Sequence, residues 1–305
     1  MKRIGILVNR IKPNALEAAT LAGECATARG MALFGTPEDL ALVRTGTPCE
    51  PRDFAASGVE AVVCIGGDGA MLRAAHALHG SNLPLAGVNI GHLGYLTAAQ
   101  VPQLDALFDA LLADTVLHSP RTMLAGRCLR ADGSVDELPD ALNEFVLSRG
   151  AGLHLEKIAV DIDGHSVTTF ACDGIIVSTP TGSTAYSLSA GGPVILPEAG
   201  VFALSVICPH ALGARPLVFS EDSAIGLRAL RATRERPAVA SVDGHNVLHL
   251  EDGDRLELRR SPRTVDILHL PGHDRFLVLS EKLGWGGRRE PPSDNDPASI
   301  HPADA

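Results

Sequence analysis

The stretch Ala61-Val-Val-Cys-Ile-Gly-Gly-Asp-Gly-Ala-Met-Leu72 carries five apolar residues into a Gly-Gly-Asp-Gly turn and then into a helical pattern. This order predicts a buried strand, a tight turn and the start of a helix. Glycines let a ligand approach the backbone closely, and a helix N-terminus offers free N–H groups to an anion. Gly67 and Gly69 therefore make a phosphate-suited loop around Asp68.

Asp68 is the unexpected residue of this loop, because a carboxylate repels phosphate. One explanation is that it takes a proton from an attacking hydroxyl or holds a metal ion. The other is that it caps the helix that follows. The loop by itself leaves both explanations open.

The first part of the chain alternates apolar strand patterns with helical ones. Strands are expected near 4–8, 59–65 and 83–89, and helices lie between and after them, the last near 101–112. Such alternation predicts a parallel sheet covered by helices, a Rossmann-like or phosphofructokinase-like α/β domain over residues 1–117. Ligands of such sheets bind beyond the carboxyl ends of the strands, where the glycine loop falls.

The pattern changes after residue 117, where strand patterns dominate. Asp163-Gly164 separates two alternating runs and predicts a β-hairpin. We expect a mostly antiparallel β domain over 118–267, and a returning segment, 268–285, that completes the first domain. The segment 286–305 is rich in Pro, Arg, Asp and Ser without periodicity, which is typical of a disordered tail.

The composition limits the kinds of molecule that the protein is expected to bind and the compartment in which it is expected to work. The chain has 305 residues, a net charge of −10 and six cysteines without a Cys-x-x-Cys pair. An acidic chain argues against nucleic-acid or membrane-surface binding, and scattered cysteines indicate free thiols in a reducing compartment. Neither a signal peptide nor an apolar run long enough to span a membrane is visible, so a cytoplasmic protein is expected.

Several catalytic signatures are missing from the sequence. There is no Gly-x₄-Gly-Lys-Ser/Thr loop, no Gly-x-Gly-x-x-Gly after the first strand and no His-Glu-x-x-His pair. These absences argue against a P-loop kinase and against an ordinary dinucleotide oxidoreductase. They also predict no metal site built from protein ligands.

Two further stretches suggest a nucleotide site. Eight hydroxyl side chains lie between Ser178 and Ser189, after an apolar strand and before a helix-like segment. Hydroxyls bind ribose and phosphate without needing basic residues, whereas capping a helix needs only one or two of them. Asn143-Glu144, just before another apolar run, has the groups to clamp a ribose diol or an amino-purine edge.

Together these motifs resemble the ATP-NAD kinase family, in its proteobacterial form. The resemblance covers about residues 1–285 in a single order. It rests on segments 66–69, 89–97, 143–144, 173–193, 209–217 and 282–285.

The resemblance implies transfer of the γ-phosphoryl of ATP to the 2′-hydroxyl of the adenosine ribose of NAD, with Mg²⁺ accompanying ATP. Asp68 is then the catalytic base. The residues implied to bind the nucleotides are Gly67, Gly69, Arg73, Asn143, Glu144, His154, Ala171, Asp173, Thr184, Ala185, Tyr186, Ser187, Leu188, Ser189 and His245. Ala171 stands where close relatives often carry a basic residue, and His245 where they often carry Gln.

The resemblance also implies a homo-oligomer, a dimer or a tetramer, whose β domains form the interface and complete the NAD site between subunits. Two alternatives remain. A diacylglycerol-type lipid kinase shares the Gly-Gly-Asp-Gly loop, although a lipid pocket should be lined by apolar side chains. A non-catalytic NAD(P) sensor would keep the pocket without needing Asp68.

Overall fold

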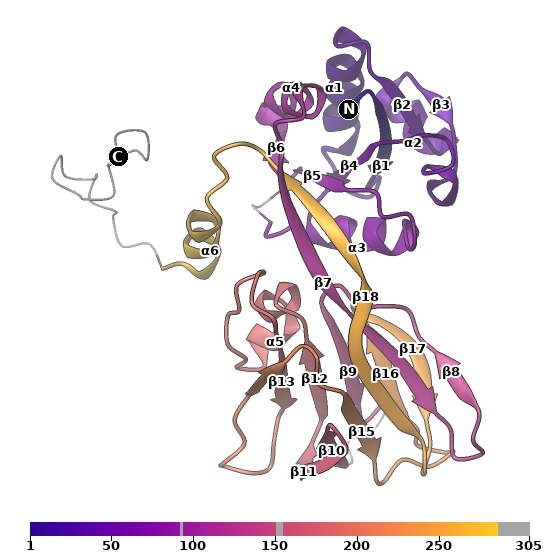
Figure 1. Cartoon of the computed structure of the whole chain (residues 1–305), viewed down its shortest axis with the longest axis vertical. Helices are drawn as coiled ribbons and strands as arrows, with labels where there is room; N and C mark the ends of the chain where they lie inside the picture. The colour runs from indigo at the N-terminus through magenta and orange to yellow at the C-terminus, as the bar shows by residue number, and fades with distance from the viewer. Residues whose placement is uncertain (92–93, 151–154, 286–305) are drawn as a thin grey trace, which may run out of the picture.

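The chain forms an α/β domain followed by an all-β domain, stacked along the long axis of the molecule (Figure 1). The structure is a computed structural model that describes residues 1–91, 94–150 and 155–285. His154 and the tail 286–305 lie outside the described residues. Among the described residues, no helix has both the length and the hydropathy of a membrane span.

The α/β domain contains the parallel sheet expected from the sequence. Its strands lie in the order β3-β2-β1-β4-β5, and the short β6 pairs with β5. β1 and β4 are neighbours although β2 and β3 come between them in sequence, so the direction of winding reverses there. The strand bounds are β1 Arg3–Val8, β2 Ala32–Gly35, β3 Thr47–Pro48, β4 Ala61–Gly66, β5 Leu85–Asn89 and β6 Ala99–Gln100.

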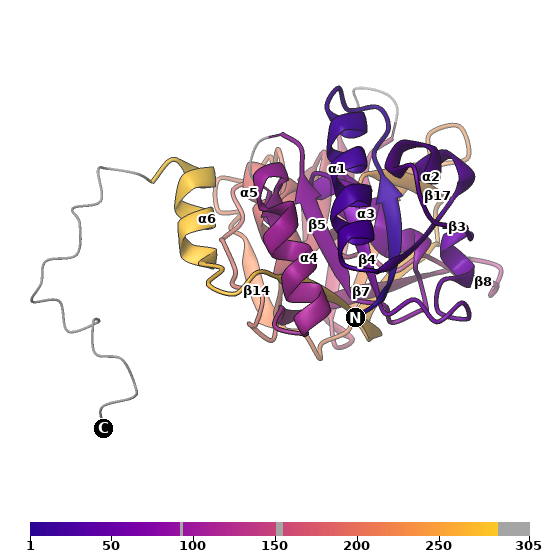
Figure 2. The ribbon, with the colours of Figure 1, turned by 90° about the horizontal axis from the view of Figure 1, so that it is seen from above.

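Helices cover both faces of this sheet, which explains why every residue of β4 is buried. α1 and α4 share a core on one face and lie side by side in the view from above (Figure 2), while α3 packs on the other face. The helix expected near 101–112 buries all of its leucine and phenylalanine side chains except Leu112. The helices and 3₁₀ turns are α1 Ala15–Ala28, α2 Pro37–Val43, η1 Pro51–Asp53, α3 Asp68–Ala77, η2 Val101–Gln103 and α4 Leu104–Ala113.

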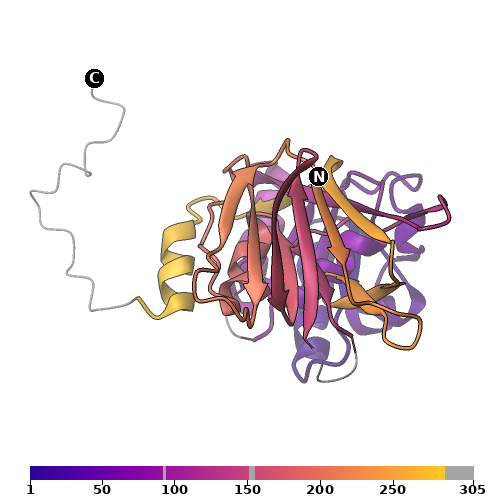
Figure 3. The same cartoon turned by 90° about the horizontal axis from the view of Figure 1, so that it is seen from below.

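The β domain is a sandwich of two antiparallel sheets. One sheet has the order β14-β13-β12-β9-β16-β17, and the other contains β11-β10-β15-β18 with β7 and β8. Seen from below, these strands lie in front of the α/β domain (Figure 3). Their bounds are β7 Leu117–Leu129, β8 Val135–Glu137, β9 Glu144–Ser148, β10 Glu156–Ile162, β11 His165–Cys172, β12 Gly174–Ser178, β13 Val201–Ile207, β14 Leu217–Ser220, β15 Ile225–Ala229, β16 Ala238–Val242, β17 His245–Leu250 and β18 Arg255–His269.

The hairpin expected around Asp163-Gly164 joins β10 to β11. Both turn residues have positive φ, 52° and 77°, as a tight two-residue hairpin turn requires. The inward-facing strand residues of the two sheets form one apolar core. The sequence pattern and the structure therefore agree on the antiparallel character of this domain.

Two long strands join the domains. β7 and β18 pair along most of their length, and Ile267 of β18 pairs in parallel with Leu85 of β5. The boundary expected near residue 117 thus coincides with the start of β7, and the one expected near residue 267 lies within β18. After β18 the chain forms α6 (Arg275–Leu283), which lies to one side of the body (Figure 1).

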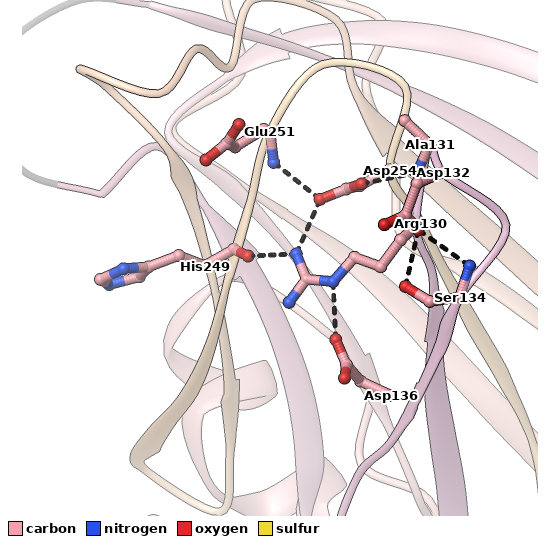
Figure 4. Close-up of polar contacts among 8 residues, drawn as sticks. All are labelled: Arg130, Ala131, Asp132, Ser134, Asp136, His249, Glu251 and Asp254. Atoms are coloured by element: carbon pink, nitrogen blue, oxygen red, sulfur yellow. Dashed lines mark hydrogen bonds and ion pairs between the residues drawn. The ribbon is translucent and has the colours of Figure 1, made fainter.

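The far end of β7 is fixed by a clamp around Arg130 (Figure 4). Its Nε donates to Asp136 at 2.6 Å, and its Nη1 donates to Asp254 at 2.8 Å and to the carbonyl of His249. Asp254 also accepts the N–H of Ala131. The clamp ties the β7–β8 hairpin to the β17–β18 turn, so the end of β7 far from the α/β domain is anchored.

Candidate active site

The glycine loop lies at the carboxyl end of β4, beside the point where the winding of the sheet reverses. β4 ends at Gly66, Gly67 is the N-cap of α3 and Asp68 is its first residue. A Cβ on Gly66 would lie 2.3 Å from the Cβ of Ala70, so only glycine lets the chain turn so tightly into the helix. The backbone N–H groups at the start of α3 therefore face the position typical of nucleotide sites in such sheets.

The carboxylate of Asp68 points away from its own helix. Its two oxygens accept the backbone N–H groups of Tyr95 and Leu96, each at 3.0 Å, in the loop after β5. A Cβ on Gly94 would come within 2.1 Å of this carboxylate, so glycine is required there as well. Asp68 does not cap α3, which removes the capping explanation for its presence in the loop.

Lys282 from α6 approaches the same carboxylate. Its Nζ lies 3.5 Å from Oδ2 of Asp68 and 5.0 Å from the centre of the Tyr95 ring. Burial, with a smaller effect of Asp68, raises the pKa of the Tyr95 phenol. Lys282 stood in the sequence analysis only within segment 282–285 of the resemblance, so sequence reasoning missed its contact with Asp68.

A cleft of about 650 Å³, including its part open to solvent, lies between Asp68 and the β domain. It brings together five of the residues expected at the site, Asp68, Asn143, Thr184, Ala185 and Leu188. The remaining lining residues are Tyr95, Leu96, Thr181, Lys282 and Leu283. The cleft therefore joins the glycine loop to the amide and hydroxyl groups of the β domain.

Asn143-Glu144 is held by Asp243, which lies between β16 and β17. The buried Asp243 carboxylate accepts the backbone N–H groups of Leu142, Asn143 and Glu144 at 2.8–3.1 Å. Its Oδ2 also contacts Nε2 of His76 on α3 at 2.8 Å. One carboxylate thus positions the Asn-Glu pair and ties it to the helix that follows the glycine loop.

Glu144 is buried beside Asn143, with 6% of its surface exposed. Burial and the neighbouring Asp243 carboxylate raise the pKa of Glu144 to about 8. Its Oε2 has no hydrogen-bond partner among the described residues. A buried polar atom without a partner is unusual in a folded protein and suits a site that a polar ligand completes.

The Ser/Thr segment folds into the turn η3 (Thr181–Thr184) and the short α5 (Tyr186–Ser189). Most of its hydroxyls hold the chain together. Thr179 donates to the Leu142 carbonyl at 2.6 Å, Ser183 to the Pro180 carbonyl at 2.7 Å, and Ser187 bonds Ser205 at 3.0 Å. Only Thr181 and Thr184 of this segment's hydroxyl residues line the cleft, so the number of hydroxyls overstated the polar surface offered to a ligand.

Other expected residues lie elsewhere. Ala171 and Asp173 precede β12, whereas the cleft begins after its other end, about 17 Å along an extended strand. Asp173 accepts Nε–H of Arg149 at 2.9 Å. Tyr186, Ser189 and His245 are exposed outside the lining of the cleft, and the Ser187 hydroxyl faces the interior.

Arg73 lies on the other side of the glycine loop from the cleft. It lines a separate cavity of about 510 Å³ with Asn9, Arg10 and Asp39. The carboxyl of Asp39 is buried, and burial raises its pKa. Gly69 lies close to this side, because a Cβ there would be 3.9 Å from Nη1 of Arg73. The loop therefore has one face toward each cavity.

Across residues 1–91, 94–150 and 155–285, no three His, Cys, Asp or Glu side chains form a group that could hold a metal ion. Mg²⁺ usually keeps several waters and is bound by one or two carboxylates together with substrate phosphates. Asp68, which lines the cleft, is a carboxylate of that kind. The donor set therefore fits a magnesium ion that arrives with a nucleotide.

A carboxylate on a glycine loop that faces an amide- and hydroxyl-bearing β domain defines a two-domain kinase class. Family models match both parts of the chain, the ATP-NAD kinase N-terminal domain over residues 43–116 and the ATP-NAD kinase C-terminal domain over residues 142–270. The chain belongs to the ATP-NAD kinase family.

Individual relatives agree with the family models. An NAD kinase of Gemmatimonas aurantiaca is 38% identical over 75% of this chain and 78% of its own length. An NAD kinase of Moorella thermoacetica is 36% identical over 99% of this chain and 95% of its own length.

Solved structures share the fold. Yeast NADH kinase, complexed with NADH, superposes with a TM-score of 0.84 at 22% identity, covering 96% of this chain and 90% of that one. An NAD kinase from Archaeoglobus fulgidus, in complex with ATP, gives 0.71 at 24% identity over 93% of this chain and 100% of its own.

Proposed function

We propose that this protein phosphorylates the 2′-hydroxyl of the adenosine ribose of NAD with ATP and Mg²⁺, giving NADP and ADP. The observation that carries the proposal is the cleft that joins Asp68 to Asn143 and Thr184. The family to which the chain belongs and the residues that line its cleft both support this reaction.

Asp68 is the general base. A ribose hydroxyl is a poor nucleophile at neutral pH, and a positioned base contributes about 10²–10⁴-fold to such a step. Asp68 takes the proton of the 2′-hydroxyl while the oxygen attacks the γ-phosphorus and the bond to ADP breaks. The two backbone N–H groups that bind its carboxylate fix its orientation toward the cleft.

The glycine loop and Mg²⁺ serve the triphosphate. Gly67 and Gly69 leave the loop without side chains that would obstruct a phosphate chain. Asp68 would hold Mg²⁺ together with the phosphates, and the ion would supply neutralisation of the charge that develops during transfer. Arg73 lies beside Gly69 and reaches the phosphates from the second cavity.

Asn143 and Glu144 bind the adenosine half of NAD. Asn143 offers both a donor and an acceptor in the cleft. At neutral pH the raised pKa of Glu144 keeps its carboxyl protonated, so its O–H can donate to a ligand oxygen or nitrogen. Thr184, Ala185 and Leu188 form the wall beside them.

A second copy of the chain completes the NAD site. Ala171 and Asp173 lie too far from the cleft of their own chain to touch the same ligand, which supports their use by a neighbouring subunit. The exposed Tyr186, Ser189 and His245 take the same role, with the β domain as the oligomerisation domain, whereas the buried Ser187 holds its own turn through Ser205.

The decisive experiment is NADP formation from NAD, ATP and Mg²⁺, coupled to an NADP-specific dehydrogenase. NADH as acceptor and polyphosphate as donor are run in parallel. We expect turnover with NAD and ATP. Phosphorylation of diacylglycerol in place of NAD would reveal a lipid kinase, and tight NAD binding by calorimetry without turnover would reveal a sensor.

A further inference from the structure

Arg121 on β7 is a buried arginine without an acidic partner. Its residue is 6% exposed, its Nε has no hydrogen-bond partner, and no carboxylate of the described residues lies within ion-pair distance. Arg130, just beyond the other end of the same strand, bonds Asp136 and Asp254 (Figure 4). A buried charge is costly unless it is paired, and the nearby Glu198 carboxylate pairs with Arg275 instead of Arg121.

His269 at the end of β18 adds a second unpaired donor. Its Nε2 lies 3.5 Å from Nη2 of Arg121. A guanidinium has only donors, so Nε2 accepts and Nδ1 carries the hydrogen. His269 is 4% exposed and its Nδ1 has no partner. Burial, His273 and Arg121 lower the pKa of His269 to about 3, so it remains a neutral donor.

Arg121 and His269 line a cavity of about 830 Å³, solvent-open part included, between β7, β18 and the start of α6, and their two unpaired donor atoms lie buried at its wall. His273, stacked on His269 at 4.0 Å, and Arg275 also line it. Its carboxylates are Glu198, which bonds Arg275, and Asp274, which caps α6 by accepting two backbone N–H groups. Both carboxylates are therefore already hydrogen-bonded, whereas Nε of Arg121 and Nδ1 of His269 have no acceptor.

This cavity has no lining residue in common with the catalytic cleft, but a third hollow lies between the two. A largely apolar slot of about 530 Å³ shares Arg121 and His273 with the cavity and shares Tyr95, Thr181 and Thr184 with the cleft. None of the residues assigned to the phosphoryl transfer lines the cavity itself. A ligand there would lie beside the catalytic cleft without displacing Asp68.

We propose that Arg121 and His269 form a second anion site that binds a phosphate oxyanion. The donors are Nε–H of Arg121 and Nδ1–H of His269, and His273 and Arg275 line the entrance. A planar guanidinium matches the oxygens of a phosphate group. A free phosphate chain and the phosphate tail of a nucleotide both have such an oxyanion. The proposal is independent of which acceptor the enzyme phosphorylates.

The test is calorimetry on the full chain with inorganic tripolyphosphate and, separately, ADP. We compare the wild type with Arg121→Met, which removes the charge but keeps most of the volume, and with the control Arg259→Met, an exposed arginine on β18. R121M loses charge-assisted hydrogen bonds, so it should bind whichever of the two probes the site recognises at least about tenfold more weakly than the wild type does. R259M should bind that probe as the wild type does. Weakening for tripolyphosphate indicates a free phosphate chain, and weakening for ADP alone indicates a nucleotide tail.

His273→Gln, at the half-buried wall of the cavity, gives a second measurement if R121M does not fold. It should also weaken the recognised probe while R259M does not. Crystals soaked in tripolyphosphate or ADP should then show density at Nε of Arg121 and Nδ1 of His269. Equal affinities in all variants, no binding of either probe, or a carboxylate of a second copy seated on Arg121 would overturn the proposal.

Discussion

Asp68 and Glu144 are two carboxyl groups on facing domains, and their surroundings differ in every respect. Asp68 has a side chain about one-third exposed, accepts two backbone N–H groups and lies near Lys282, and all of these neighbours stabilise negative charge. Glu144 is buried beside the Asp243 carboxylate with an unpartnered oxygen, and its pKa is raised to about 8. The comparison teaches that Asp68 is an oriented hydrogen-bond acceptor at the open cleft, whereas Glu144 is a buried group that keeps a proton.

The largest expected effect comes from removing the acceptor. Asp68→Asn keeps the size of the side chain but loses the carboxylate, so we expect the rate of NADP formation to fall by about 10²–10⁴-fold. NAD binding, measured by calorimetry, should persist because Asn143 and Glu144 are untouched. Asp53→Asn, at an exposed position in η1, is the control. A rate within a few fold of the wild type would assign the base elsewhere.

The second effect concerns the residue that places Glu144. Asp243→Asn puts an amide group among the backbone N–H donors of residues 142–144 and against His76. Leaving a buried donor unpaired should lower the free energy of unfolding by about 1–3 kcal/mol, measured by urea denaturation. Asp222→Asn, at a side chain that is 81% exposed, should change little. Equal losses in both variants would contradict the role given to Asp243.

The third test isolates the proton on Glu144. The folded-state pKa of about 8 lies above the ordinary value of 4.5. Relative to Glu144→Gln, the stability that the wild type gains from this proton is complete below pH 4.5 and is lost as the pH rises through 8. Unfolding free energies of wild type and E144Q across pH 4–9 measure the difference, with Glu137→Gln as an exposed control. A flat difference would mean that Glu144 is ionised in the folded protein.

The elements that set up this comparison were predictable because they depend on local patterns. The apolar run ending in Gly66-Gly67 gives β4, the turn and α3, and Asp163-Gly164 gives the hairpin of β10 and β11. Each pattern is complete within a few residues, so tertiary context is not needed to interpret it.

The surroundings of the two carboxyls were not predictable, because residues distant in sequence create them. Asp243 looks like a turn residue until its hairpin is packed against residues 142–144. Lys282 reaches Asp68 only because β18 returns the chain to the α/β domain. The number of hydroxyls in the Ser/Thr segment overstated the size of the ligand site for the same reason, because the sequence does not show that Ser183 and Ser187 point inward.

The smallest expected effect concerns Lys282, the group that most distinguishes the neighbourhood of Asp68 from that of Glu144. Lys282→Met keeps the length of the side chain and removes its charge. If the ammonium moves from Asp68 to the triphosphate when ATP binds, the variant should raise the KM for ATP up to about tenfold, as expected for one charge-assisted hydrogen bond. Lys2→Met, just before the amino end of β1 and so at the end of the sheet opposite the glycine loop, makes the same change in net charge and should have no effect. A higher kcat in K282M would instead mean that the lysine restrains Asp68, and the two carboxyls would then differ in their restraint as well as in their protonation.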